Sequence, residues 1–170
     1  LVGAYNLTNC VAALFIGAYF GVSIEESASA IADYIPDNNR SELKKTASNL
    51  LLMDAYNANP TSILAALNSF LSDKEYKDKV VVLGDMFELG VYAAQEHQAI
   101  ADYLAEIKGV KAFLLGENFA KTTIAKESDI KVYASVSEMQ AHLQENKIEG
   151  AYILLKGSRG MALENLVEYL

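Results

Sequence analysis

The chain has 170 residues, and 52% of them are hydrophobic, which is enough for one substantial domain with a core and an appendage. Its net charge of −8 argues against nucleic acid or an anionic membrane surface as the main partner. The one cysteine, Cys10, excludes an internal disulfide framework and has no metal-binding spacing, so we expect a cytoplasmic protein.

The first 24 residues carry no charge, so a membrane span or a signal segment has to be considered. Asn6 and Asn9 interrupt the run, its apolar part over 10–22 is too short to span a bilayer, and no basic segment precedes it. We therefore expect a buried helix and no membrane insertion. Because the chain opens on Leu1, we also expect a fragment that begins inside a larger protein.

Two helices are predicted at the start, over 7–20 and 24–34. The second begins with a capping box, Ser23 and Glu26. The polar, turn-forming segment 36–40 is the best linker. We place a domain boundary there, between residues 1–36 and 37–170.

Strands and helices alternate beyond this linker. Strands are predicted over 43–46, 50–54, 79–83, 111–115, 130–133 and 151–155; helices are predicted over 61–71, 93–108, 118–126, 138–144 and 161–169, with Ser137 and Gln140 capping the fourth. The alternation predicts an α/β fold: a mostly parallel, Rossmann-like sheet with helices on both faces, preceded by the two-helix segment.

The most informative segment is the loop 54–60 (DAYNANP), which lies between a predicted strand and a predicted helix. Asn59 can cap that helix, and Pro60 suits its first position because proline lacks an N–H that has no partner there. The loop sits at the carboxyl end of its strand, where open α/β sheets bind ligands. Segments 84–90, 116–118 and 156–161 should lie at the same edge.

One of these segments could bind an anion, and a second stretch only resembles an anion site. Residues 156–161 (KGSRGM) offer cations and backbone N–H groups before a predicted helix, although a turn with two solvated charges fits the pattern as well. Residues 116–122 (GENFAKT) follow a strand and end in Lys-Thr, but they lack the second glycine of a phosphate-binding P-loop. We therefore exclude a triphosphate site of that type here.

Five separated motifs together resemble the Mur ligase family. They are residues 3–9 (GAYNLTN) with Ala12 and Ala13, Arg40, residues 54–60, residues 82–86 (VLGDM) with 88–90 and His97, and residues 156–161. Residues 56–60 (YNANP) and the Gly-Asp-Met segment 84–86 are similar to the branch that joins D-alanyl-D-alanine to UDP-N-acetylmuramoyl-tripeptide. The resemblance covers the end of the ATP-binding central domain and the complete C-terminal domain.

The resemblance implies ATP-dependent peptide-bond formation through an acyl phosphate, in the synthesis of peptidoglycan precursors. In such enzymes the P-loop, the Mg²⁺ ligands and the UDP-binding domain lie upstream of a segment like this one. We therefore expect no turnover by residues 1–170 alone, and we assign no catalytic residue and no metal ligand within them.

The resemblance also implies roles for five residues in binding ATP. Asn9 would hydrogen-bond adenine, Asn6 would support that loop, and Tyr5, where many members have histidine, would abut the base. Arg40 would reach the phosphates when the domains close, and Asp54 would bind the ribose. The alternatives are that Asn6 and Asn9 merely start a helix and that Arg40 is a solvated linker charge.

Five candidates for binding the dipeptide follow from its carboxylate, which needs hydrogen-bond donors and a positive site. They are Asn57, Asn59, Lys156, Ser158 and Arg159. His97 could be catalytic, but we favour a structural role as a hydrogen-bonded partner of the loop around Asp85, because no nucleophile stands near it in the sequence. We expect His142 to lie on a solvated helix face.

Two alternatives remain for the function. The closest is another Mur-type ligase that adds a different amino acid. A flavodoxin-like module that binds a small ligand would share the alternation of strands and helices. A Rossmann oxidoreductase would need a G-x-G-x-x-G motif, which the sequence lacks.

Overall fold

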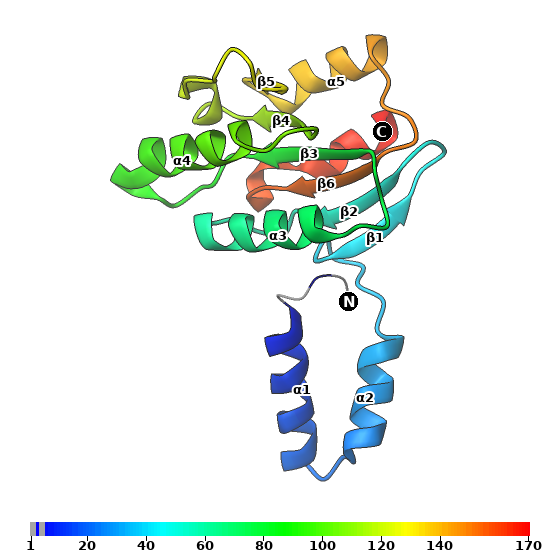
Figure 1. Ribbon diagram of the computed structural model, residues 1–170. Helices are drawn as coiled ribbons and strands as arrows, with labels where there is room; N and C mark the ends of the chain where they lie inside the picture. The colour runs from blue at the N-terminus through cyan, green and yellow to red at the C-terminus, as the bar shows by residue number, and fades with distance from the viewer. Residues whose placement is uncertain (1–2, 4–5) are drawn as a thin grey trace.

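The computed structural model describes residue 3 and residues 6–170, and it consists of a helical hairpin next to an α/β domain (Figure 1). The hairpin contains α1 (Leu7–Tyr19) and α2 (Ile24–Asp33), which confirms both predicted helices. Ser23 Oγ accepts a hydrogen bond from the Glu26 N–H, and the Glu26 carboxylate accepts one from the Ser23 N–H. The predicted capping box is therefore present.

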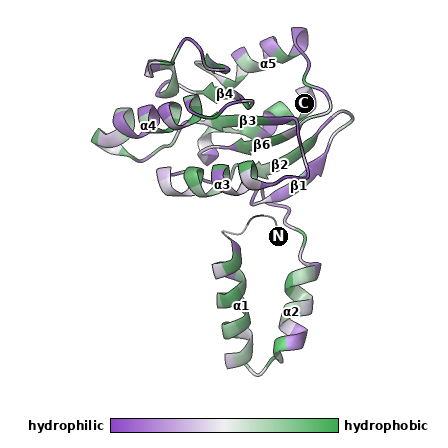
Figure 2. Cartoon of the chain, viewed as in Figure 1, coloured by the Kyte–Doolittle hydropathy of each residue, from purple (hydrophilic) through white to green (hydrophobic). Residues whose placement is uncertain are grey.

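The expectation that the first helix is buried is wrong for this chain. No residue of α1 is buried, and Phe15 and Tyr19 are 77% and 81% exposed. Figure 2 shows apolar colour along most of α1. The reason is that α1 packs against α2 and leaves its other apolar sides in solvent.

Residues 34–41 connect the hairpin to the α/β domain without forming a helix or a strand. This confirms that the predicted linker 36–40 is a connecting segment. Asn39 and Ser41 have positive φ angles of 58° and 51°, which turn the chain before the first strand begins. The assignment of the two sides to separate domains stays a prediction.

The described residues form a six-stranded sheet with the order β1-β2-β6-β3-β4-β5. The strands are β1 (Glu42–Lys45), β2 (Leu50–Asp54), β3 (Lys79–Gly84), β4 (Lys111–Leu115), β5 (Ile130–Tyr133) and β6 (Tyr152–Lys156). β1 pairs antiparallel with β2, and the other neighbours pair in parallel, which confirms the predicted mostly parallel sheet.

Helices cover both faces of the sheet, as predicted (Figure 1). α3 (Pro60–Ser72) and α4 (Ala93–Ala105) share one core with Leu52, whereas α5 (Val136–Glu145) and the 3₁₀ helix η5 (Leu163–Tyr169) share the other with Leu51. Successive strand residues face opposite sides of a sheet, so a continuous apolar run supplies both cores. Short 3₁₀ helices occur at η2 (Gly90–Tyr92), η3 (Phe119–Lys121) and η4 (Arg159–Met161).

Three local predictions are wrong. The predicted helix over 118–126 is the single turn η3, because the backbone extends again at Thr122. The cap of α5 is Ser135, whose hydroxyl accepts from the Glu138 N–H, and the helix therefore starts two residues earlier than predicted. The last helix is the 3₁₀ helix η5, which follows Ala162 in the left-handed conformation.

Candidate functional site

An ion pair at the carboxyl edge of the sheet links two of the predicted site residues. Asp54 and Lys156 are partners in the parallel register of β2 and β6, and their side chains meet with Nζ 2.7 Å from Oδ2. Lys156 also donates to the Asn57 carbonyl at 3.3 Å, and only 2% of the residue is exposed. The loops after β2 and β6 therefore rise from the same edge, as predicted.

A pocket of about 390 Å³ collects most of the predicted site residues. It lies where the start of α1, the connecting segment and the loop after β2 meet. The predicted members are Asn6, Asn9, Arg40, Asp54, Asn57, Asn59 and Lys156, and Tyr34, Ser41, Tyr56 and Ser62 complete the lining. Tyr5, the remaining nucleotide candidate, lies outside the described residues.

The two asparagines of this pocket contact each other. Asn9 Nδ2 donates to Asn6 Oδ1 at 3.4 Å, and Asn6 Nδ2 donates to Ser41 Oγ at 3.0 Å. Asn6 occupies the N-cap position of α1, but its side chain makes no capping hydrogen bond. The Asn6 side chain thus joins the hairpin to the connecting segment. This contact favours the predicted supporting role of Asn6 over the alternative that the residue only starts α1.

Arg40 lies over an aromatic ring at the border of the pocket. Its guanidinium carbon is 3.7 Å from the centre of the Tyr56 ring, and among the described residues it forms no ion pair. A guanidinium that lies over an aromatic ring can still donate from its N–H groups to an anion. The contact therefore holds the cation in place without neutralising it.

A second pocket of about 330 Å³ adjoins the first and shares Tyr56 and Asn57 with it. Its other lining residues are Phe87, Glu88, Ser158, Arg159 and Gly160. The Ser158 hydroxyl oxygen accepts from the Phe87 N–H at 2.8 Å, and Ser158 is buried. The Arg159 side chain is 60% exposed, and its Nη1 lies 3.3 Å from a Glu164 oxygen.

The dipeptide candidates are thus divided between the two pockets. Ser158 and Arg159 line the second, Asn59 and Lys156 line the first, and Asn57 lines both. Asn59 Oδ1 accepts from the Ser62 N–H at 2.8 Å, which confirms the predicted cap of α3. Asn59 and Lys156 therefore already have structural partners. The sequence analysis gave no role to Phe87 or Glu88, although both lie within segment 84–90, which it placed at this edge of the sheet.

Asp85 and His97 organise the loop after β3. The buried Asp85 carboxylate accepts from the backbone N–H groups of Asn118 and Phe119 at 2.9 and 3.0 Å. His97 Nε2 accepts from the Met86 N–H at 3.0 Å, so Nδ1 carries the proton and donates to the Ala93 carbonyl at 2.6 Å. This geometry favours the structural interpretation of His97.

The same contacts explain why segment 116–122 is no phosphate site. The N–H groups that could cradle an anion are already bound by the Asp85 carboxylate. Gly116 has a φ of +125°, and a Cβ there would lie 2.3 Å from Asp85 Cγ. Asp85 thus occupies the place that a phosphate would need.

The expectation for His142 is wrong. The residue is half-buried, with its ring centre 5.4 Å from that of Tyr133. Burial lowers the pKa of His142, and the charge of Lys131 lowers it further. The neutral imidazole is therefore favoured, and its Nδ1 accepts from the Asn146 amide at 3.3 Å.

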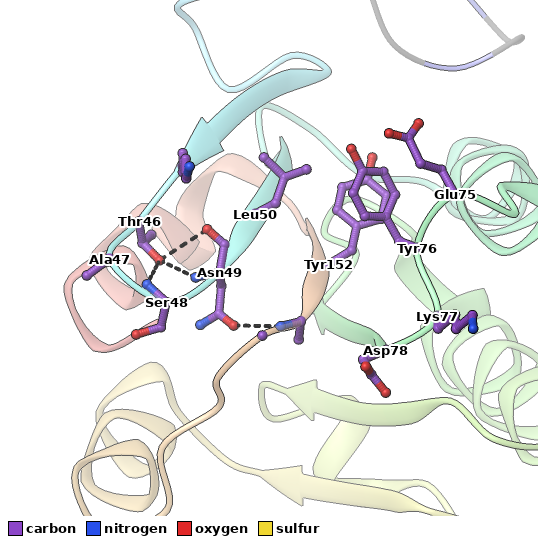
Figure 3. Close-up of a pocket in the computed structure, with 13 residues that line it drawn as sticks. Thr46, Ala47, Ser48, Asn49, Leu50, Glu75, Tyr76, Lys77, Asp78 and Tyr152 are labelled. Atoms are coloured by element: carbon purple, nitrogen blue, oxygen red, sulfur yellow. Dashed lines mark hydrogen bonds between the residues drawn. The ribbon is translucent and has the colours of Figure 1, made fainter.

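Further hollows lie at the opposite, amino edge of the sheet. Figure 3 shows one of about 520 Å³, in which the Tyr76 and Tyr152 rings lie against each other. Its buried polar side chain, Asn49, accepts from the Ala151 N–H at 3.0 Å and donates to the Ile148 carbonyl at 2.7 Å. The Asn49 side chain therefore links the start of β2 to the segment before β6, and it is not directed at a ligand.

No helix among the described residues is long and apolar enough to cross a bilayer. No group of three or more His, Cys, Asp or Glu side chains in that part of the chain is arranged to hold a metal ion.

Comparisons with known proteins agree with one another. The model of the family described as "Mur ligase, glutamate ligase domain" matches residues 39–159. A UDP-N-acetylmuramoyl-tripeptide–D-alanyl-D-alanine ligase from Bacillus subtilis is 35% identical over 176 aligned residues, which cover all of this chain and 38% of that protein. This chain therefore spans less than half the length of that relative.

Solved structures show the same pattern. A MurF crystal structure from Acinetobacter baumannii superposes with a TM-score of 0.80 at 27% identity, covering 98% of this chain and 37% of the other. MurF ligase from Thermotoga maritima, solved in complex with ADP, superposes with a TM-score of 0.72 at 20% identity over 92% of this chain and 35% of the other, a likeness of fold.

Proposed function

Because the chain belongs to the Mur ligase family, we propose that it is part of an ATP-dependent ligase that joins D-alanyl-D-alanine to UDP-N-acetylmuramoyl-tripeptide. The relative from Bacillus subtilis is named as a ligase of that kind. The alignment with it covers the whole of this chain. The proposed reaction makes a peptidoglycan precursor in the cytoplasm, with an acyl phosphate as intermediate.

The proposed division of labour follows the connecting segment. Residues 1–36 would be the last helices of the ATP-binding central domain, and residues 37–170 the C-terminal Rossmann-like domain. The exposed apolar side chains of α1, such as Phe15 and Ile16, support this division because such a helix needs a further packing surface. In this proposal Mg²⁺ and its ligands belong to the part of the ligase that this chain does not cover.

One observation carries the nucleotide part of the proposal: the 390 Å³ pocket combines amides from the hairpin with a cation from the connecting segment and a carboxylate from the end of β2. These groups suit the three parts of ATP. The amide of Asn9 can pair with a base edge, Arg40 can bind phosphate oxygens, and Asp54 can accept from a ribose hydroxyl. Only Oδ2 of Asp54 is engaged by Lys156 among the described residues, so Oδ1 remains an acceptor. ATP would supply the activation of the tripeptide carboxylate.

The second pocket is the proposed acceptor site. Arg159 would bind the carboxylate of D-alanyl-D-alanine, and Asn57 and Ser158 would line the path to the first pocket. Because the two pockets share Tyr56 and Asn57, an amine in one could face an activated carboxyl group held beside the other. Such positioning is the main contribution that this domain could make to the rate.

The test uses the ligase that contains this chain. We expect phosphate release that requires ATP, the nucleotide-linked tripeptide and D-alanyl-D-alanine together. Release supported equally well by a single amino acid would favour another Mur-type ligase. For residues 1–170 alone we expect at most weak ATP binding by calorimetry and no ligation, since the described residues contain no P-loop.

A further inference from the structure

Glu88 has an unusual backbone for its residue type. Its φ angle is +64°, in the left-handed region that side chains other than those of glycine, asparagine and aspartate rarely adopt. Such outliers persist where the surrounding structure holds them, and they concentrate at functional sites. Glu88 lies in the wall of the 330 Å³ pocket, next to the exposed ring of Phe87.

The two residues that precede Glu88 are held in place by contacts with other elements. The Met86 N–H donates to His97 Nε2, and the Phe87 N–H donates to Ser158 Oγ. The Phe87 ring packs on Gly160 so closely that a Cβ on that glycine would lie 2.6 Å from Phe87 Cε2. The loop is therefore anchored to α4 and to the start of η4, and the exposed Glu88 lines the pocket.

The pocket is lined by one carboxylate and one guanidinium, Glu88 and Arg159. No ion pair joins these two residues, and Arg159 pairs with Glu164 instead. Within the described part of the chain the Glu88 carboxylate has no hydrogen bond and no ion pair. A pocket with two separate opposite charges is complementary to a zwitterion.

We propose that Glu88 binds the N-terminal ammonium group of the acceptor dipeptide while Arg159 binds its carboxylate, so that Glu88 selects acceptors with a free amine. The proposal rests on the proposed function, which places the dipeptide in this pocket. It adds a specificity residue that the sequence analysis did not identify. The anchoring by His97 and Ser158 then serves to aim this carboxylate.

The test varies the charge on both partners. The isotope-labelled ligase that contains this chain is titrated with D-alanyl-D-alanine and with N-acetyl-D-alanyl-D-alanine, which lacks the ammonium group, and amide shifts at Phe87 and Gly160 are followed by NMR. The variants are Glu88→Gln and Arg159→Gln. Glu117→Gln is the matched control, because Glu117 is an exposed carboxylate at the same sheet edge that does not line this pocket.

We expect Glu88→Gln to weaken binding of the free dipeptide about fivefold, which corresponds to about 1 kcal/mol, and Glu117→Gln to change nothing. Acetylation should weaken binding to the unmodified chain by a similar factor and make Glu88→Gln neutral. The acetylated ligand leaves the protein untouched, so this comparison does not depend on how a variant folds.

Other outcomes separate the two proposals. If the free dipeptide binds and Arg159→Gln weakens it while Glu88→Gln does not, the acceptor site stands and the role of Glu88 is refuted. Equal effects of Glu88→Gln on both ligands would also refute it. If the dipeptide shifts no amide around the pocket, the acceptor site itself is wrong, and the role of Glu88 falls with it.

Discussion

Asp54 and Lys156 lie 102 positions apart in the chain, yet Lys156 Nζ donates to Asp54 Oδ2 at 2.7 Å across the ends of two neighbouring parallel strands. The two loops that follow these strands are thereby joined into one polar surface. Both residues are also proposed to bind ligands, so the structural part of their role has to be measured separately from any part in binding.

The Lys156→Met variant should be markedly less stable. Removing one partner leaves the other as an unpaired charge that is largely buried, which typically costs about 3–5 kcal/mol. Urea denaturation measures the free energy of unfolding. The double variant Lys156→Met/Asp54→Leu should recover much of the loss, and a single variant as stable as the unmodified chain would show that the pair contributes little.

Arg40→Ala should lower the turnover of the complete ligase at least about tenfold, since a charge-assisted phosphate contact is worth about 1.5–3 kcal/mol. The free energy of unfolding should fall by less than about 1 kcal/mol, because the substitution removes only an exposed stack on the Tyr56 ring. Steady-state kinetics measures the turnover of this variant, and urea denaturation measures its free energy of unfolding. Normal turnover with a large drop in stability would make Arg40 structural.

Arg159→Ala should raise the KM for D-alanyl-D-alanine about tenfold or more, the factor that about 1.4 kcal/mol gives, with little effect on the KM for ATP. The reason is that Arg159 lines the second pocket and not the first. Lys121→Ala, which removes an exposed cation outside both pockets, is the control. An effect confined to the KM for ATP would contradict the proposed dipeptide site.

Glu88→Gly should increase the free energy of unfolding by about 1 kcal/mol, because glycine adopts the left-handed region without the clash of a Cβ. Ala162→Gly, at a φ of 50° outside both pockets, should give a similar gain. Chemical denaturation compares the two. Binding of the dipeptide should suffer only in Glu88→Gly, and a loss of stability there would show that the Glu88 side chain holds the loop.

His142 should make the chain less stable as the pH falls below its ordinary pKa of 6.5. Its pKa is lowered in the folded state, so between the lowered value and 6.5 the unfolded chain binds the proton and the folded chain does not. The free energy of unfolding therefore rises with pH through that window. His142→Gln should remove this part of the dependence, whereas Gln144→Ala on the same helix should keep it; an unchanged pH profile in His142→Gln would contradict the lowered pKa.

Features that depend on neighbours in the chain could be predicted from the pattern of residues. Asn59 caps α3 through Ser62, three residues away, and Ser23 caps α2 through Glu26 in the same way. The period of the apolar residues predicted the alternation of strands and helices. A parallel sheet brings all its carboxyl ends to one edge, so the common location of Asp54 and Lys156 could also be predicted.

The pairing of distant polar groups and the burial of apolar side chains depend on how the whole chain packs, so they could not be predicted from the pattern. The Asp85 carboxylate binds the Asn118 and Phe119 N–H groups, 33 and 34 positions further along the chain, and no local pattern contains that pairing. Lys79, unremarkable in the sequence, donates to the Phe70 and Leu71 carbonyls at the end of α3, at 2.7 and 3.1 Å. Partners far apart in sequence meet because packed layers bring them together, and that packing is a property of the whole chain, so no local window of residues contains it.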